Sequence, residues 1–246
     1  MKNIKDLSPK QINQHVKIGT KLPLATSLHY PSRGQTAIQE LYLTKIGKLF
    51  LKKTSKRNHQ DCQVNEKNGS LAEREYWCFC LARYIGLNTP PLWLIDKNTT
   101  IQIWFNIPDA HIYTSSHGKM FFLAENIYNC ALFDWLTGQI DRHNANYLYD
   151  YINKKIILID SAHSLLKHTG SLPDYLEKFE LINDSDFSKK QQTIVSKKLL
   201  SLSKNKLEQL IPLKDLSEKK ALLWRHNQIK QINTIKDIIE LYRRNK

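Results

Sequence analysis

Three polar residues in the second half of the chain have the types and spacing that metal-assisted phosphoryl transfer requires. Asp141 can orient a hydroxyl group and accept its proton, and Asn146 can turn back from the same loop to bind a metal ion. The apolar run that ends at Asp160 predicts a buried strand with this carboxylate at its end. Because Mg²⁺ prefers oxygen ligands, Asp160 is the expected holder of the ion that bridges the phosphates.

The elements around these residues can be predicted from the apolar pattern. Apolar side chains recur every three or four residues across positions 122–139, which predicts a helix that leads into Asp141. Two β-prone runs, at residues 147–149 and 155–160, predict a hairpin. Since the polar residues fall at the ends of these elements, the pattern favours a cleft lined by reactive groups.

The order of these residues resembles that of a known family. The stretch GQIDRHNAN, followed by a strand that ends in Ile-Asp, is similar to the catalytic core of the atypical kinases. This group includes the phosphatidylinositol kinases, the CotH-type and secretory-pathway kinases and the HipA-like toxin kinases, and the order GxxDRHxxN, strand, ID is most similar to the first of these. The resemblance implies an α+β fold that is bilobal and protein-kinase-like, with a small antiparallel-sheet lobe and a mainly helical large lobe.

The resemblance also implies roles for residues of the large lobe. Asp141 would be the catalytic residue, and Asn146 and Asp160 would bind the metal ion. Arg142 and His143 would support the loop, with His143 hydrogen-bonded behind the aspartate.

Histidines near the aspartates raise the alternative of a different metal site. Imidazole is a ligand for zinc and transition metals, whereas carboxylate and amide oxygens suit Mg²⁺, so we expect Mg²⁺ or Mn²⁺ and a structural place for His143. His163 is harder to place, because the kinase template has a glycine within two residues of the Asp160 position and this chain has SAH there. This departure leaves the course of the following loop open.

The N-terminal half contains candidates for contacts to the nucleotide phosphates. Two β-prone runs joined by a turn at Gly47 predict a hairpin, and Lys52 near its end has, by resemblance, the position of the lysine that contacts the α and β phosphates. Lys53 is the alternative, because a shift of one residue reverses the face of a strand. The turn at residues 31–36 contains Gly34, which by resemblance would lie against the phosphates, although a plain β-turn explains the same residues.

A helix is predicted from residue 71 to residue 85, with Gly86 as its C-terminal cap. The stretch EYWCFCLARYIGLNTPP resembles the pattern E-x-x-x-Y/F-x-L-x-x-x-x-G-L-x-x-P-P of the atypical kinases. By this resemblance Glu75 pairs with the strand lysine and holds it on the phosphates, and Glu73 is the alternative.

The predicted division of the chain has three parts. Residues 1–22 form an N-terminal lead-in, residues 23–106 the small lobe and residues 107–246 the large lobe. Within the small lobe, residues 54–70 are predicted as a loop, and β-prone runs within residues 92–105 complete the sheet.

Composition limits the class of protein. With 246 residues, of which 41% are hydrophobic, the chain can bury one large core or two lobes. Its net charge of +14 predicts attraction to anions. The last sixty residues, predicted as two or three helices, hold 15 Lys and Arg against 5 Asp and Glu, a net charge of +10. An anionic membrane or an acidic partner is therefore a candidate for these basic C-terminal helices.

Cysteine usage and the N-terminus bear on location. The four cysteines form no C-x-x-C pair and no disulfide framework, which favours reduced core thiols. The N-terminus has no apolar signal-peptide region, and no segment approaches about 18 consecutive apolar residues. We expect a soluble cytoplasmic protein, or one that is secreted into a host cell without a cleavable signal peptide.

Taken with the resemblance, these patterns predict an ATP-dependent atypical kinase. A protein hydroxyl is the first expected acceptor, because a short kinase without accessory domains resembles the bacterial effector and toxin kinases, and an inositol lipid is the second. Three alternatives stay open: a pseudokinase that binds nucleotide without turnover, transfer of AMP instead of phosphate, and nucleic-acid binding by the basic helices. No helix-turn-helix, zinc or RNA-stacking motif supports nucleic acid.

Overall fold

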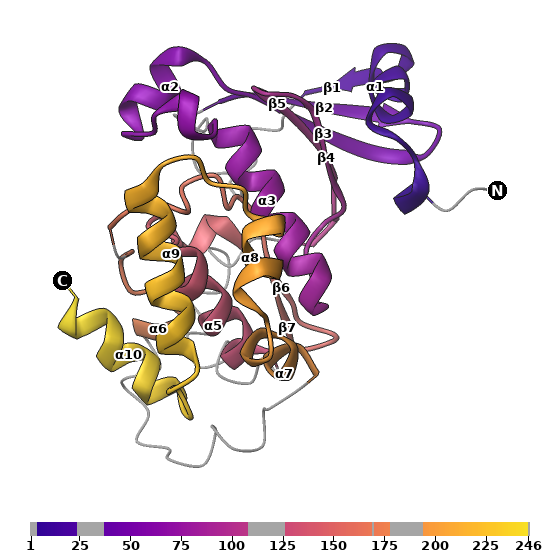
Figure 1. Ribbon diagram of the computed structural model, residues 1–246. Coiled ribbons are helices and arrows are strands. Elements are labelled where there is room, and N and C mark those ends of the chain that lie inside the picture. The colour runs from indigo at the N-terminus through magenta and orange to yellow at the C-terminus, as the bar shows by residue number, and fades with distance from the viewer. Residues whose placement is uncertain (1–3, 24–36, 108–125, 169, 178–193, 246) are drawn as a thin grey trace.

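The computed structural model describes residues 4–23, 37–107, 126–168, 170–177 and 194–245. These residues form two lobes, an antiparallel sheet with its helices and a mainly helical lobe below it (Figure 1). Helix α3 (Leu71–Ile85) runs from the sheet down along the helices of the large lobe. The predicted α+β, bilobal, kinase-like fold class is confirmed.

The small-lobe sheet has five strands in the order β1-β2-β3-β5-β4, and each neighbouring pair is antiparallel. Its strands are β1 (Thr20–Leu22), β2 (Ile38–Thr44), β3 (Gly47–Lys53), β4 (Leu92–Asp96) and β5 (Thr99–Ile103). Lys52 pairs with Gln39 on one side and with Thr100 on the other. Because neighbouring residues of a strand face opposite sides, β3 buries Lys52 and leaves Lys53 exposed.

The N-terminal residues, predicted as a lead-in over residues 1–22, pack against the small-lobe sheet. Helix α1 (Pro9–Ile18) begins with a capping box at Ser8, and β1 adds an edge strand to the sheet. The buried Ile12 and Val16 lie one helical turn apart and join the apolar side chains of β3, β4 and β5 in one core. Two apolar residues in an otherwise polar helix are too few for hydrophobic periodicity to predict the helix.

Residues 54–70 contain a short helix where a loop was predicted. Helix α2 (Lys56–Asp61) begins with a capping box at Ser55. His59 lies buried in it and accepts a hydrogen bond at Nε2 from the backbone nitrogen of Leu71, 3.1 Å away. This bond satisfies one of the free N–H groups at the start of α3, so the loop is ordered by a contact that sequence spacing does not show.

Helix α3 begins and ends where the sequence predicts. Its N-terminal capping box pairs Ser70 with Glu73, whose Oε2 accepts from the Ser70 nitrogen at 2.8 Å. Gly86 ends the helix with φ of 84°, a left-handed conformation that glycine adopts without strain. Because Glu73 is used in the cap, Glu75 is the carboxylate left to face the sheet.

The large lobe is built around helix α5 (Ile127–Thr137), in which every residue is buried. The predicted start of this helix at residue 122 lies outside the described residues. A two-stranded hairpin, β6 (Tyr147–Asp150) and β7 (Lys155–Leu158), lies beside it as predicted. The remaining helices are α6 (Asp174–Glu177), α7 (Ile194–Leu200), α8 (Lys204–Leu210), α9 (Leu216–Ile229) and α10 (Ile235–Arg244).

The C-terminal region holds four described helices, α7 to α10, where two or three were predicted. The apolar series of Ile229, Ile232, Ile235, Ile239 and Tyr242 predicts one helix, but it spans the end of α9 and most of α10. Thr234 caps α10 and breaks the series, since its side chain accepts from the backbone of Asp237 at 3.1 Å. None of the described helices combines the length and apolar character that a bilayer-spanning segment needs.

One buried ion pair connects α3 with the C-terminal helices. Arg74 is completely buried, and its Nη2 donates to both carboxylate oxygens of Glu218 in α9, at 2.9 and 2.8 Å. Its Nη1 donates to the backbone oxygens of Ser164 and Leu165, and its Nε to that of Gly69. The guanidinium thus holds the start of α3 against the segment that follows β7.

We expect Glu218→Ala to lower the free energy of unfolding by about 3 kcal/mol, because it leaves the Arg74 charge buried without its carboxylate. Urea unfolding measures this change. Glu240→Ala is the control, since it removes an exposed pair with Arg244 in α10 and should change stability by less than about 0.5 kcal/mol. Equal losses in the two variants would contradict a structural role for the buried pair.

Candidate functional site

The lysine and the two carboxylates predicted to act together lie in contact between the lobes. Lys52 Nζ is 3.1 Å from Glu75 Oε1 and 2.7 Å from Asp160 Oδ1. Lys52 and Glu75 are buried, whereas the Asp160 side chain is 31% exposed. Thr100 on β5 donates from Oγ1 to the other Glu75 oxygen at 3.1 Å. The pairing of β3 with β5 therefore fixes both the lysine and the group that orients its partner.

These contacts determine the charges of the three groups. Burial opposes the charge on Lys52, but the attraction of Asp160 and Glu75 outweighs burial and raises the pKa of the lysine. The pKa of Asp160 is lowered by Lys52 against the effect of its burial. Burial raises the pKa of Glu75, with Lys52 acting in the opposite direction. Two carboxylates thus face one ammonium group, so a further positive charge would be favourable beside them.

The loop with Asp141 and Asn146 forms the floor of the site. Asn146 Nδ2 donates to the backbone oxygen of Asp141 at 2.6 Å and lies 3.4 Å from its Oδ2. His143 caps the short 3₁₀ turn of the loop by accepting from the backbone nitrogen of Ala145. The Asp141 side chain is 45% exposed, so an acceptor molecule can reach it.

Arg142 is the residue that holds this loop to the end of β7. Its side chain is completely buried and paired with the equally buried Asp134 of α5 at 2.9 Å. Its Nη1 donates to the backbone oxygens of Asn146 and Ile159, and its Nη2 donates to Ser161 Oγ. The sequence analysis predicted that Arg142 supports the loop, but it did not identify Asp134. The only sign of Asp134 in the sequence is that it is a single acidic residue in an apolar helix.

His163 lies against the proposed catalytic aspartate. Its Nδ1 is 3.5 Å from Asp141 Oδ2, whereas His143 Nε2 is 3.7 Å from Asp141 Oδ1. Burial alone would lower the pKa of His163, but interactions with Asp141 and Cys62 raise it to about 9. The direction of this shift favours the protonated imidazole beside Asp141.

Gln139 supports the backbone of Asp160 and was not found from the sequence. It follows the helix cap at Gly138 and is completely buried. Its Nε2 donates to the Asp160 backbone oxygen at 2.9 Å, and its Oε1 accepts from Ser164 Oγ at 3.2 Å. Asp160 has φ of 50°, a conformation that non-glycine residues rarely adopt and that surrounding structure must hold in place.

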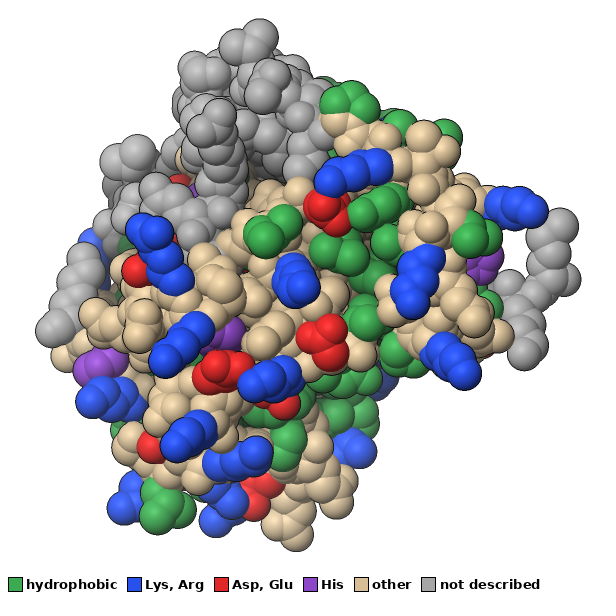
Figure 2. All heavy atoms as spheres, turned by 90° about the horizontal axis from the view of Figure 1, so that it is seen from above, with side chains coloured by type: hydrophobic (Ala, Val, Ile, Leu, Met, Phe, Trp, Pro, Cys, Tyr) green, Lys and Arg blue, Asp and Glu red, His purple; other side chains and the backbone are tan. Residues whose placement is uncertain are grey.

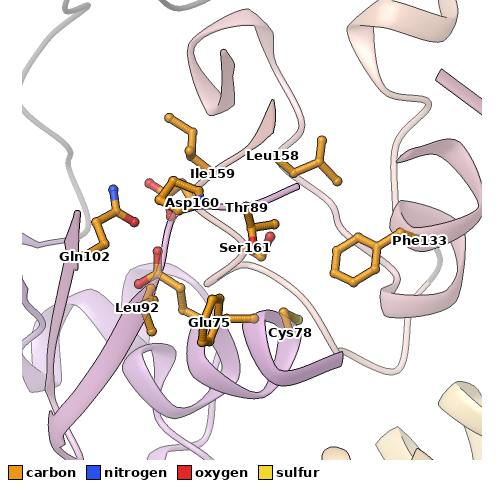
Figure 3. Close-up of a pocket in the computed structure, with 12 residues that line it drawn as sticks. Glu75, Cys78, Thr89, Leu92, Gln102, Phe133, Leu158, Ile159, Asp160 and Ser161 are labelled. Atoms are coloured by element: carbon orange, nitrogen blue, oxygen red, sulfur yellow. The ribbon is translucent and has the colours of Figure 1, made fainter. Parts of the chain in front are cut away.

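A small pocket with a cavity volume of about 20 Å³ lies behind these groups (Figure 3). Glu75 enters it from α3 and Asp160 from the end of β7, while Phe133 and Leu158 close it on the large-lobe side. Gly34, the predicted phosphate-loop residue, lies outside the described residues.

The donor set suits a hard cation such as Mg²⁺ or Mn²⁺. Asp160 supplies a partly exposed carboxylate, and the nitrogen of the Asn146 amide is held by Asp141, which leaves the amide oxygen for a ligand. Among the described residues no group of three or more His, Cys, Asp or Glu side chains could hold a metal.

Sequence comparison does not identify a family. No protein-family model matches the chain, and no curated protein matches it.

Several solved structures are similar to this one. The alignment with the proinflammatory kinase CtkA of Helicobacter pylori covers 91% of this chain and 97% of CtkA, with 15% identity and a TM-score of 0.49. The FAT and kinase domain of CtTel1 covers 92% of this chain and 24% of its own, at 10% identity and a TM-score of 0.47.

A pseudokinase is also among the similar structures. The pseudokinase domain of BIR2, an immune regulator of the RLK/Pelle family, covers 96% of this chain and 91% of its own, at 13% identity and a TM-score of 0.37. Scores and identities this low say nothing about activity, and the neighbours include both kinases and a pseudokinase. The chemistry of the site must therefore be inferred from its geometry.

The raised pKa of His163 predicts a pH-dependent stability. A folded-state pKa of about 9, above the ordinary 6.5, adds stability that is fully present below about pH 6.5 and is lost as pH rises through about 9. A shift of this size corresponds to at most about 3 kcal/mol. Unfolding free energies at pH 6 and about 9.5 should therefore differ more in the native chain than in His163→Gln. The exposed His168→Gln is the control, and an equal pH effect in all three proteins would contradict the prediction.

The contacts of Gln139 predict a specific effect on metal binding. Gln139→Met keeps the side-chain volume but removes the donor that holds the Asp160 backbone, so we expect about tenfold weaker Mn²⁺ binding in the presence of nucleotide. The measurement is the Mn²⁺ concentration that gives half of the nucleotide-induced increase in melting temperature. Ser164→Ala is the control, since it removes the other partner of Gln139 and leaves the Asp160 contact. An unchanged Mn²⁺ midpoint in Gln139→Met would show that the residue serves stability alone.

Proposed function

We propose that the protein is an ATP-dependent kinase that transfers the γ-phosphoryl group to a hydroxyl. The observation that carries the proposal is the buried Lys52, held between Glu75 and Asp160 beside the loop of Asp141 and Asn146. A structural ion pair would need only one carboxylate. Two carboxylates around one ammonium, with one of them partly exposed, favour a site that is completed by a metal ion and a phosphate.

Each residue has a distinct proposed part in the reaction. Lys52, oriented by Glu75, provides positive charge for the α and β phosphates, and Asp160 and Asn146 hold the metal. Mg²⁺ or Mn²⁺, when bound, neutralises charge on the phosphate oxygens. Asp141 accepts the proton of the acceptor hydroxyl as its oxygen forms a bond to the γ-phosphorus and the bond to ADP breaks.

A protein hydroxyl is the acceptor that we propose first. Asp141 is almost half exposed and is flanked by two histidines on an open loop, so an extended chain can approach it. Binding through the basic C-terminal helices is a further part of the proposal. Of the lysines at the start of that region, Lys197 and Lys198 are exposed, whereas Lys189 and Lys190 lie outside the described residues.

Incubation with ATP labelled at the γ or the α phosphate, Mn²⁺ and a protein extract tests the reaction. We expect transfer of the γ label only, and Asp141→Asn should reduce the rate about 10² to 10⁴-fold while the nucleotide-induced rise in melting temperature is retained. Asp150→Asn, in the hairpin turn away from the cleft, is the control and should retain full activity.

Each of the other outcomes would indicate a different biochemical function. Transfer of the α label would indicate a nucleotidyl transferase. Nucleotide binding without any transfer would indicate a pseudokinase, and an absence of both binding and transfer would overturn the proposal.

A further inference from the structure

A second hollow lies on the outer side of α3, apart from the catalytic cleft. It has a cavity volume of about 220 Å³ and lies at the C-terminal end of α3 and the start of β4. Phe79, Leu87 and Trp93 provide apolar walls, and Trp93 is held by a hydrogen bond from Nε1 to the Leu7 backbone oxygen, 2.9 Å long. This volume is below the range of pockets for drug-sized ligands, about 300 to 1,000 Å³, so the hollow suits a single side chain of a larger partner.

The rim of this hollow is basic. Arg83 in the last turn of α3 and Lys5 from the N-terminal segment are both exposed and both line it. Among the described residues no Asp or Glu lines the hollow, and the polar groups of Asn88 and Thr89 complete it. Lysine and arginine side chains are spread over the face in Figure 2 with acidic side chains among them, so the two cations distinguish this hollow only together with its apolar lining. Apolar walls below a cationic rim suit a ligand with an apolar side chain between anionic groups.

The hollow shares a wall with the catalytic cleft. Phe79, Thr89 and Leu92 line both spaces. Phe79 lies four residues after Glu75, so both side chains lie on one face of α3 in successive turns. A molecule in the hollow therefore touches the helix that positions Glu75 against Lys52.

We propose that this hollow binds an acidic peptide segment of a partner protein. An apolar side chain of the segment enters between Phe79 and Trp93, and its carboxylates face Arg83 and Lys5. Aromatic residues and arginine are the residue types that dominate protein interfaces.

The test measures binding of two synthetic peptides to the full chain by calorimetry, without nucleotide. One peptide has phenylalanine flanked by aspartate and glutamate, and the other has asparagine and glutamine in place of the acids. We expect the acidic peptide to bind more tightly, to weaken as salt rises, and to lose about tenfold in affinity in Arg83→Glu. Lys220→Glu, an equal charge change at an exposed position of α9, should bind normally.

Other outcomes overturn the inference. Equal binding by Arg83→Glu and the native chain would place the peptide elsewhere, and equal weakening by Lys220→Glu would show attraction to net charge alone. Complete competition by inorganic phosphate would show a simple anion site, and Arg83-dependent binding to phosphatidylserine vesicles without peptide binding would show a lipid site. Because no ATP is present, these results do not depend on whether the chain is a kinase.

Discussion

The buried ion pair between Arg142 and Asp134 is the interaction on which the rest of the site depends. Both side chains are completely buried, so their desolvation must be balanced by contacts of good geometry. Asp134 also accepts from Tyr175 Oη at 2.7 Å, and Arg142 uses its remaining donors on the backbone of the loop and of the end of β7. One guanidinium thus sets the distance between the loop of Asp141 and the carboxylate of Asp160.

Two further buried arginines act on the segment that follows Asp160. Arg74 donates to the backbone oxygens of Ser164 and Leu165, and Arg225 donates to that of Leu166. Burial lowers the pKa of Arg225 to about 10, and its Nη2 has no hydrogen-bond partner among the described residues. The course of this segment is held by side chains of α3 and α9 and by Gln139, which follows α5. These contacts favour a single conformation of the segment that contains Asp160.

The position of Glu75 connects the cleft with the rest of the small lobe. The carboxylate is held by Lys52 and Thr100 on the sheet side, while the helix that carries it ends at the outer hollow. The position of α3 therefore determines how close Glu75 lies to Lys52, and with it the balance of charge in the cleft. The two lobes are also tied at the start of this helix by Arg74 and Glu218, so a displacement of α3 would be resisted at its N-terminal end.

The sequence by itself determined much of the secondary structure. The limits of α3 and the two hairpins follow from local patterns, because caps, turns and strand alternation act between near neighbours. Lys52, Glu75 and Asp160 were selected by their resemblance to a family motif. Only the tertiary structure decided which groups meet over long separations. The partners of Arg142, the support of Asp160 by Gln139 and the place of α1 on the sheet depend on packing between distant segments, and residue spacing carries no record of such packing.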